Sequence, residues 1–224
     1  MPYYIDLSKI SLEEYKSILL TTVLLPSRQI LKENVDERFH VLKNHNIENL
    51  RQLQLQLKTP AKVKQFAETS LLPMDYLTVL RREINSYHPD DRKLKDFTCI
   101  KTNTLQALEA MGIKTTAGLY DYIVTKAARQ QLQQQLGISD SEIMLLTKLT
   151  DLSRLRYVNS TFAMLLIASG YGSVEKIKQA DYQELYERVK KTNEKEHYFK
   201  GTIGLSDMKF LVDDPMSVPF DIEY

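Results

Sequence analysis

The sequence predicts an all-α protein in which one short helical unit occurs about three times. Apolar residues recur at helical spacing, and few segments alternate apolar and polar residues as a half-buried strand does. Glycine and proline are scarce, with 7 of each among 224 residues, while the helix-favouring residues Leu, Gln, Glu, Lys and Ala are common. Residues that cap helices precede most of the periodic segments.

The clearest copy of the unit spans residues 155–177. A tight turn leads into Ser160 and Thr161, either of which can cap a helix through its hydroxyl. The apolar residues that follow keep helical spacing as far as Gly170, which stands where a glycine commonly ends a helix. Ser173 then suits the N-cap of a second helix. The segment therefore predicts two consecutive helices joined at a glycine.

Two earlier segments have the same layout. The expected caps of the second helix are Asn49, Thr115 and Ser173. Each comes three residues after an expected helix-stop residue, Asn46, Gly112 and Gly170 respectively. A later landmark, an apolar residue followed by a helix starter, recurs at Leu72–Pro73, Ile138–Ser139 and Leu205–Ser206. Both landmarks lie 66 residues apart between the first and second copies, but 58 and 67 apart between the second and third. We expect an insertion in the third copy, within the charged stretch 190–200.

The polar run HPDDRKLK at residues 88–95 is the best linker in the chain. It predicts an N-terminal helical domain over residues 1–95 with the first unit, and a C-terminal domain over residues 96–224 with the second and third. Further expected elements are a helix over 11–24 with Val23 on its apolar face, a helix capped by Asp36, and a single helix over 119–136. The tail over 212–224 is expected to lie extended along the surface.

Composition narrows the function classes. The formal net charge is +1, and no segment is strongly basic, which argues against a protein that binds nucleic acid mainly through a large basic face. The single Cys99 excludes an internal disulfide, fits a reducing compartment and is expected to be a small buried residue. Neither a signal peptide nor a membrane-spanning run is visible. We therefore expect a cytoplasmic protein without a membrane partner.

The repeated helix–turn–helix pattern resembles the helix-hairpin-helix (SAM-like) fold of DNA-repair and recombination proteins. More closely, RREINSY followed by LKDFTCI, and LLIASGYGSVEKI followed by ADYQELYERV, resemble an uncharacterised family of tandem helix-hairpin-helix domain proteins, a domain of unknown function. The resemblance covers most of the chain. It implies about three degenerate helix-hairpin-helix units and carries no established activity with it.

In DNA-binding members of that fold the hairpin reads Gly-apolar-Gly, and its backbone N–H groups approach a phosphate at a helix N-terminus. The matching turns are Tyr157–Val158–Asn159, Cys99–Ile100–Lys101 and, with less certain bounds, a turn near Glu33–Asn34–Val35. The central apolar residue is kept in the two clear copies, but neither glycine is. The resemblance therefore implies hairpins that bind phosphate poorly.

Two groups of residues are candidates for binding nucleic acid. Lys101, Arg154, Arg156 and Asn159 lie in or beside the two clear hairpins, and Lys58, Lys62 and Lys64 form the most basic local cluster, which could follow a phosphate backbone. A solvated helix face is the alternative for the three lysines. No catalytic motif, metal-ligand cluster or cofactor site is expected, because the histidines are scattered and no phosphate-binding glycine loop occurs.

These observations predict a non-enzymatic helix-hairpin-helix interaction module that binds a protein partner, or weakly a nucleic-acid backbone. A DNA-binding accessory protein that uses the hairpin turns and a structural subunit with no ligand are alternatives. An enzyme assembled from scattered polar residues would require convergent carboxylates, or a cation-flanked cysteine, in a pocket. The oligomeric state is left open.

Overall fold

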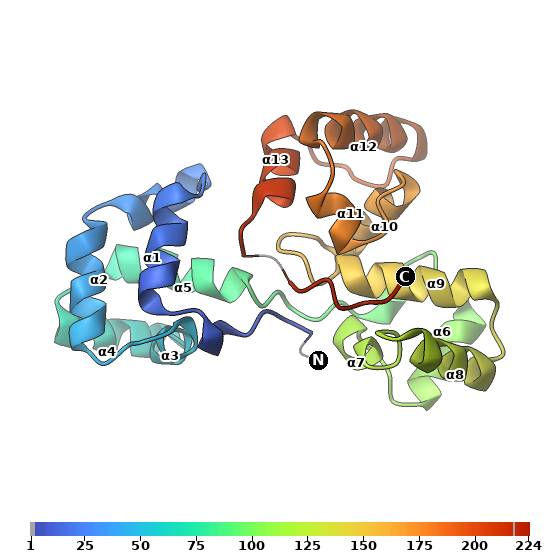
Figure 1. Ribbon diagram of the computed structural model, residues 1–224, viewed down its shortest axis with the longest axis horizontal. Coiled ribbons are helices and arrows are strands. Elements are labelled where there is room, and N and C mark those ends of the chain that lie inside the picture. The colour runs from blue at the N-terminus through green and yellow to red at the C-terminus, as the bar shows by residue number, and fades with distance from the viewer. Residues whose placement is uncertain (1–2, 217) are drawn as a thin grey trace. The chain divides into compact units, whose positions relative to one another are not determined.

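The computed structural model describes residues 3–216 and 218–224. In this part of the chain the regular secondary structure is helical, with no β-strand beyond two isolated bridges (Figure 1). The expected all-α class is therefore confirmed. No helix in the described part of the chain is both long and apolar enough to cross a membrane. The chain divides into two compact units, one ending at His88 and the other spanning Pro89–Tyr224. The sequence places this division a few residues later, after residue 95.

The N-terminal unit is a cluster of short helices around a core that includes Tyr15, Phe66 and Tyr76. Its elements are η1 (Leu7–Lys9), α1 (Leu12–Thr21), η2 (Pro26–Lys32), α2 (Val35–Asn44), α3 (Leu50–Gln56), α4 (Pro60–Ser70) and α5 (Met74–Ser86).

Two expectations in this unit are wrong. Helix α1 ends at Thr21, so Val23 lies beyond it and is 77% exposed instead of facing the core. Helix α2 begins at Val35 behind Asn34, which adopts a left-handed conformation (φ 46°) and makes no side-chain cap, so Asp36 lies within the first turn and does not cap it. Ser11 is the N-cap of α1, since its hydroxyl accepts the Glu14 N–H at 3.1 Å.

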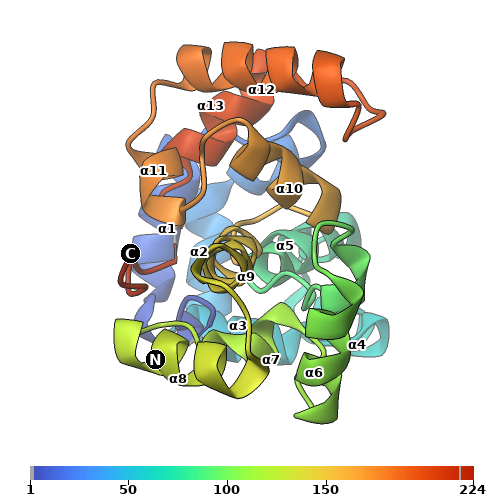
Figure 2. The ribbon, with the colours of Figure 1, turned by 90° about the vertical axis from the view of Figure 1, so that its right-hand side faces the viewer.

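In the C-terminal unit α9 lies between two groups of helices, with α6 and α8 on one side and α10–α13 on the other (Figures 1 and 2). The elements are η3 (Leu94–Asp96), α6 (Thr102–Ala110), α7 (Thr116–Tyr120), α8 (Lys126–Leu136), α9 (Asp140–Leu152), α10 (Ser160–Ala168), α11 (Val174–Lys178), α12 (Tyr182–Glu196) and α13 (Leu205–Asp213). The single helix expected over 119–136 is wrong: α7 ends at Tyr120, and Thr125 caps a new helix by accepting the Ala128 N–H.

Asn49, Thr115 and Ser173 occupy like places. Each is an N-cap, of α3, α7 and α11 respectively, and each side chain accepts the N–H three residues later. Three positions before each cap, a residue adopts the left-handed conformation: Asn46 (φ 59°), Gly112 (φ 80°) and Gly170 (φ 94°). The N–H groups of Ile47, Ile113 and Tyr171 close the preceding helix on the carbonyls of Leu42, Leu108 and Leu166, at 3.3, 2.9 and 2.9 Å. The helix stop therefore has one geometry at all three places.

The later landmark is alike at the first two places, where Leu71 and Gly137 stand two positions before the N-caps Pro73 and Ser139, and differs at the third, where seven positions separate His197 from Gly204. Helices α4, α8 and α12 each end at a left-handed residue, Leu71 (φ 60°), Gly137 (φ 63°) and His197 (φ 54°). The next N-caps are Pro73, Ser139 and Gly204. Ser206, the expected cap of the last helix, lies inside α13 instead. Helix α12 has 15 residues against 11 in α4 and α8, so a longer helix is part of the expected insertion.

The tail does not simply lie along the surface. Met216, Val218 and Ile222 are buried, and the N–H of Glu223 donates to the Val124 carbonyl at 2.9 Å. Part of the tail is therefore packed into the core of the C-terminal unit.

Candidate functional site

The turns that lead into α2, α6 and α10 share one hydrogen-bond pattern. The N–H groups of Glu33, Ile100 and Val158 donate to the carbonyls of Ile30, Phe97 and Leu155, at 3.3, 3.1 and 3.4 Å. By this pattern the first turn is Lys32–Glu33–Asn34, one residue earlier than the sequence suggests. The three turns therefore share this hydrogen bond but differ in the rest of their backbone: Asn34 is left-handed in the first turn and Tyr157 in the third, and no residue of the second turn is.

At the third turn the polar side chain is already used by the protein. Asn159 caps α10 by accepting the Phe162 N–H at 2.8 Å, so the cap is Asn159 and neither Ser160 nor Thr161. Tyr157 holds the left-handed conformation (φ 64°) that a glycine would take without strain. Its ring is part of the surface at the hairpin, where a bulky side chain obstructs the close approach of a phosphate to the backbone.

Arg156, expected beside this hairpin as a phosphate contact, is buried. Its guanidinium pairs with Asp214 at 3.2 Å and lies over the rings of Tyr157 and Phe210, with 5.3 and 5.1 Å to the ring centroids. The side chain therefore ties the turn to the end of α13 and does not face solvent.

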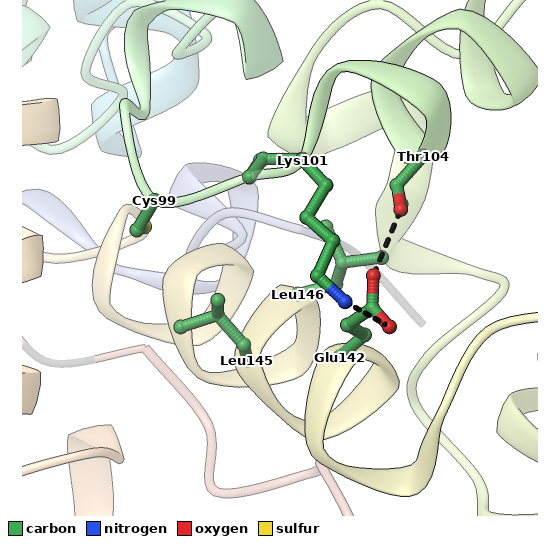
Figure 3. Close-up of a pocket in the computed structure, with 7 residues that line it drawn as sticks. Cys99, Lys101, Thr104, Glu142, Leu145 and Leu146 are labelled. Atoms are coloured by element: carbon green, nitrogen blue, oxygen red, sulfur yellow. Dashed lines mark hydrogen bonds and ion pairs between the residues drawn. The ribbon is translucent and has the colours of Figure 1, made fainter.

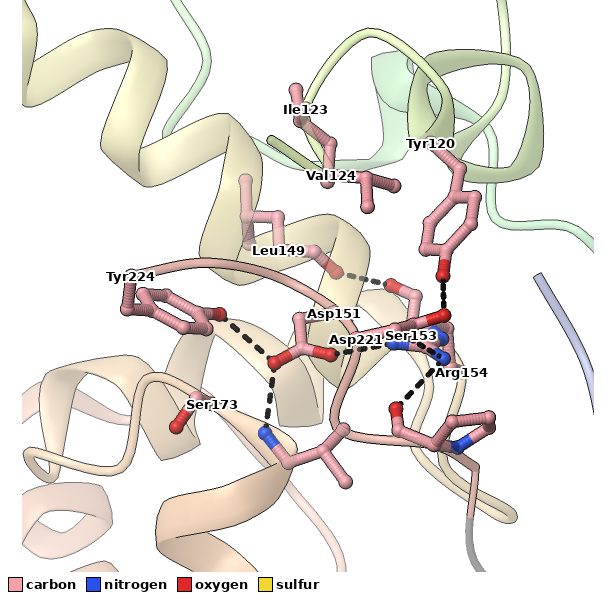
Figure 4. A network of polar contacts seen from close by, with 12 residues as sticks. Tyr120, Ile123, Val124, Leu149, Asp151, Ser153, Arg154, Ser173, Asp221 and Tyr224 are labelled. Carbon is pink, nitrogen blue, oxygen red and sulfur yellow. Dashed lines mark hydrogen bonds and ion pairs between the residues drawn. The ribbon is translucent and has the colours of Figure 1, made fainter. Parts of the chain in front are cut away.

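Arg154 is buried completely, with 0% of its side chain exposed. Its guanidinium pairs with Asp151 at 3.1 Å and with Asp221 at 2.9 Å, and it donates to the Pro219 carbonyl at 3.0 Å (Figure 4). The same group lies 4.9 Å from the ring centroid of Tyr120. Two carboxylates thus compensate one buried cation, which is the condition for a buried charge to be tolerated.

Asp151 also joins elements that are distant in sequence. Its carboxylate accepts the Val174 N–H at the start of α11 and the Tyr224 hydroxyl, both at 2.9 Å (Figure 4). At the like places in α3 and α7, the N–H of the first helical residue is accepted by a backbone carbonyl, of Ile10 and Arg92 respectively. At the start of α11 a buried carboxylate therefore accepts the N–H that a backbone carbonyl accepts at the start of α3 and α7.

Burial shifts the pKa values of several groups in this network. It raises the pKa of the Asp151 carboxyl, against the opposing effect of the Val174 N–H and the Arg154 guanidinium. Burial also raises the pKa of the Tyr120 and Tyr224 hydroxyls, which remain neutral donors, the first to Asp221 and the second to Asp151. We infer that these groups hold the fold together, since each points at a partner from the same chain.

The second turn borders a small pocket that includes Cys99, Lys101, Thr104 and Glu142 (Figure 3). Lys101 is exposed but pairs with Glu142 at 3.0 Å, and the same carboxylate accepts the Thr104 hydroxyl at 3.0 Å. These bonds, with those from Ser139, lower the pKa of Glu142 to about 2. An internal carboxylate therefore already neutralises the one lysine of this hairpin.

Cys99 is exposed, so the expectation of a buried cysteine is wrong. It is one of the residues that line the pocket beside the second turn (Figure 3). Partial desolvation raises the pKa of the thiol, the opposite of what an activated nucleophile needs.

Lys58, Lys62 and Lys64 lie in the N-terminal unit and are exposed. The structure adds Arg81, whose guanidinium donates to the Lys58 carbonyl at 3.3 and 3.2 Å, while the Lys62 ammonium donates to the Leu55 carbonyl at 3.3 Å. We call these four cations the basic corner. Within the described residues no carboxylate pairs with any of them.

Sequence reasoning missed Arg81 because it lies 23 residues from Lys58, and only the packing of α4 on α5 brings them together. No group of three His, Cys, Asp or Glu side chains in the described parts of the chain is placed to hold a metal ion. Of the predicted site residues, only the three lysines thus present a positive charge without an acidic partner.

Comparison with known proteins gives one result that concerns the C-terminal unit. Neither the curated proteins nor the solved structures contain a match to this chain. A family model described as a domain of unknown function (DUF4332) matches residues 98–214, from the second turn to the end of α13. Because this match spans more than half of the chain, the protein belongs to the DUF4332 family.

Proposed function

We propose that the protein is a non-enzymatic interaction module of three helix-hairpin-helix-like units, and that the basic corner binds a nucleic-acid backbone weakly. The like geometry of the three helix stops, and the one hydrogen bond that the three turns share, support the repeat. Each unit is then a pair of helices joined at a left-handed residue, followed by two further helices.

The non-enzymatic part of the proposal is supported by the buried polar groups. Asp151 and Asp221 converge as a catalytic pair would, but Arg154 and two tyrosine hydroxyls take up their oxygens. The carboxylates therefore serve as structural anions around a buried cation.

The observation that carries the binding proposal is the absence of acidic partners around the basic corner. Lys62 and Arg81 donate hydrogen bonds to backbone carbonyls, which satisfies them as donors but leaves their positive charge uncompensated. An anionic partner gains from such charges at low ionic strength. The hairpin turns offer less positive charge to such a partner, because Lys101 pairs with Glu142 and because Arg154 and Arg156 are buried.

The test is a fluorescence-anisotropy titration of labelled duplex and single-stranded DNA at several salt concentrations. Four phosphate contacts predict a slope of log K against log salt of about −3 to −4 for duplex DNA. The triple variant Lys58→Gln, Lys62→Gln, Lys64→Gln should lose most of the binding.

The matched control is the triple variant Lys190→Gln, Lys191→Gln, Lys200→Gln, which removes the same charge from exposed positions of the C-terminal unit. It should bind as the unchanged protein does. Equal losses in the two variants, or no binding at low salt, would refute the role of the basic corner.

A further inference from the structure

Leu71 is a residue whose side chain the fold itself does not use. It ends α4 in the left-handed conformation (φ 60°), and it is 88% exposed. The like place at the end of α8 is Gly137, which adopts that conformation without a steric cost. A leucine at this point therefore costs backbone energy and places apolar surface in water, with no internal contact in return.

The exposed surface extends beyond Leu71. Pro73 and Met74 follow it and are exposed as well, whereas the intervening Leu72 is buried. We call Leu71, Pro73 and Met74 the apolar knuckle. Glu68 and Asp75 flank it on α4 and α5 and are exposed, and residues 65–80 contain neither lysine nor arginine. The knuckle is thus an apolar centre flanked by negative charge.

The opposite end of α4 has the complementary character. There Leu55 is 42% exposed, its carbonyl is bonded by Lys62, and Lys58, Lys64 and Arg81 complete the basic corner. Since α4 has 11 residues, the two ends are separated by about 16 Å at 1.5 Å per residue. The apolar side chains of the knuckle therefore cannot contact Lys58 and Lys62 of the same molecule, although Glu68 and Lys64 lie one helical turn apart on α4.

We propose that the apolar knuckle of one molecule docks on the basic corner of a second copy of this chain. Each surface contains an exposed leucine, Leu71 in the knuckle and Leu55 beside the corner, and the charges near the two are opposite in sign, so the contact buries apolar area and pairs the charges. Because the contact uses a different patch on each copy, it gives an open chain unless it closes into a ring or a two-fold dimer. In each case the associated fraction rises with protein concentration and falls with salt.

Sedimentation velocity over a concentration series at low salt tests this. The unchanged protein should form species larger than a monomer, whereas Leu71→Asp and Lys62→Glu should each stay monomeric. Mixed in equal amounts, the two variants should form a heterodimer and nothing larger, because the first retains only the corner and the second only the knuckle. The control Val23→Asp changes another exposed apolar residue of the same unit, 77% exposed against 88% for Leu71, and should leave association unchanged.

Leu71→Gly separates docking from folding. It should abolish association and leave the melting temperature of the monomer unchanged or higher, since the left-handed strain is removed. The proposal is overturned if the unchanged protein stays monomeric, if Leu71→Asp associates normally, or if the mixed variants form no complex.

The outcome is distinguishable from that of the nucleic-acid proposal, although both use the basic corner. Leu71→Asp keeps the corner and should bind DNA normally, whereas Lys62→Glu should lose both activities. DNA binding without self-association would refute the docking alone, and self-association without DNA binding would refute the nucleic-acid role alone.

Discussion

At the scale of single residues, the environment decides what a charged side chain does. Arg154 and Arg156 flank a hairpin in the sequence and read as phosphate contacts, yet both guanidinium groups are buried against carboxylates. Their partners Asp221 and Asp214 follow 67 and 58 residues later. Spacing along the chain could not reveal this, because these pairs exist only once the tail has packed.

Asn159 is a residue whose role can be isolated. Replacing it with alanine removes the acceptor of the Phe162 N–H and should lower the free energy of unfolding by about 1 kcal/mol, the usual cost of an N-cap. Urea denaturation followed by far-UV circular dichroism measures the loss. The matched control is Ser160→Ala, which should have little effect because Ser160 makes no cap; an equal loss would show that the hydroxyl shares the capping.

At the scale of helices, the repeated helix stop shows how local chemistry ends an element. Asn46, Gly112 and Gly170 all take positive φ, and each allows the next N–H to bond back to a carbonyl of the preceding helix. Asparagine and glycine are the residues that adopt this conformation most readily. The three stops could therefore be predicted from residue type, as could the caps that follow them.

Replacing either of two glycines, one before α7 and one inside it, with alanine should change the stability of the protein in opposite directions. Gly112→Ala should destabilise the protein by about 1–2 kcal/mol, because the left-handed φ of 80° penalises a Cβ. Gly118→Ala should stabilise it by about 0.5–1 kcal/mol, since Gly118 is inside the helix and an added Cβ would make only an ordinary contact, at 3.5 Å from the Thr115 hydroxyl. Thermal denaturation of the two variants and of the unchanged protein measures both changes in stability. A loss in both would mean that α7 does not tolerate a methyl group.

At the scale of the whole molecule, the tail completes the C-terminal unit. It crosses α9 and supplies Asp221 to Arg154 and the Tyr224 hydroxyl to Asp151 (Figure 4). The family match ends at residue 214, so these groups lie outside the region that the family model covers. The buried charges of α9 and the turn after it are therefore compensated by a segment beyond the family domain.

Removing residues 218–224 should destabilise the C-terminal unit by several kcal/mol, because Arg154 loses a carboxylate and the core loses Val218 and Ile222. Hydrogen exchange followed by mass spectrometry should show faster exchange in α9 and α11 and unchanged exchange in α2–α5. Phe220→Ala, at a position that is 55% exposed, is the control and should leave exchange unaltered. Unchanged protection after truncation would contradict the structural role of the tail.

The sequence by itself determined the helical class, the like places of Asn49, Thr115 and Ser173, and the exposed lysine cluster. These features depend on residue type and on spacing within one or two helical turns, which act locally along the chain. The end of α7 at Tyr120 was missed, because no glycine or proline marks it.

Only the tertiary structure decided which charges remain uncompensated. It buried Arg154 and Arg156, paired Lys101 with Glu142, brought Arg81 beside Lys58 and placed Cys99 at the surface. Each of these outcomes, apart from that of Cys99, depends on a partner more than 20 residues away. Electrostatic compensation follows distance in space, and the order of residues along the chain does not specify that distance.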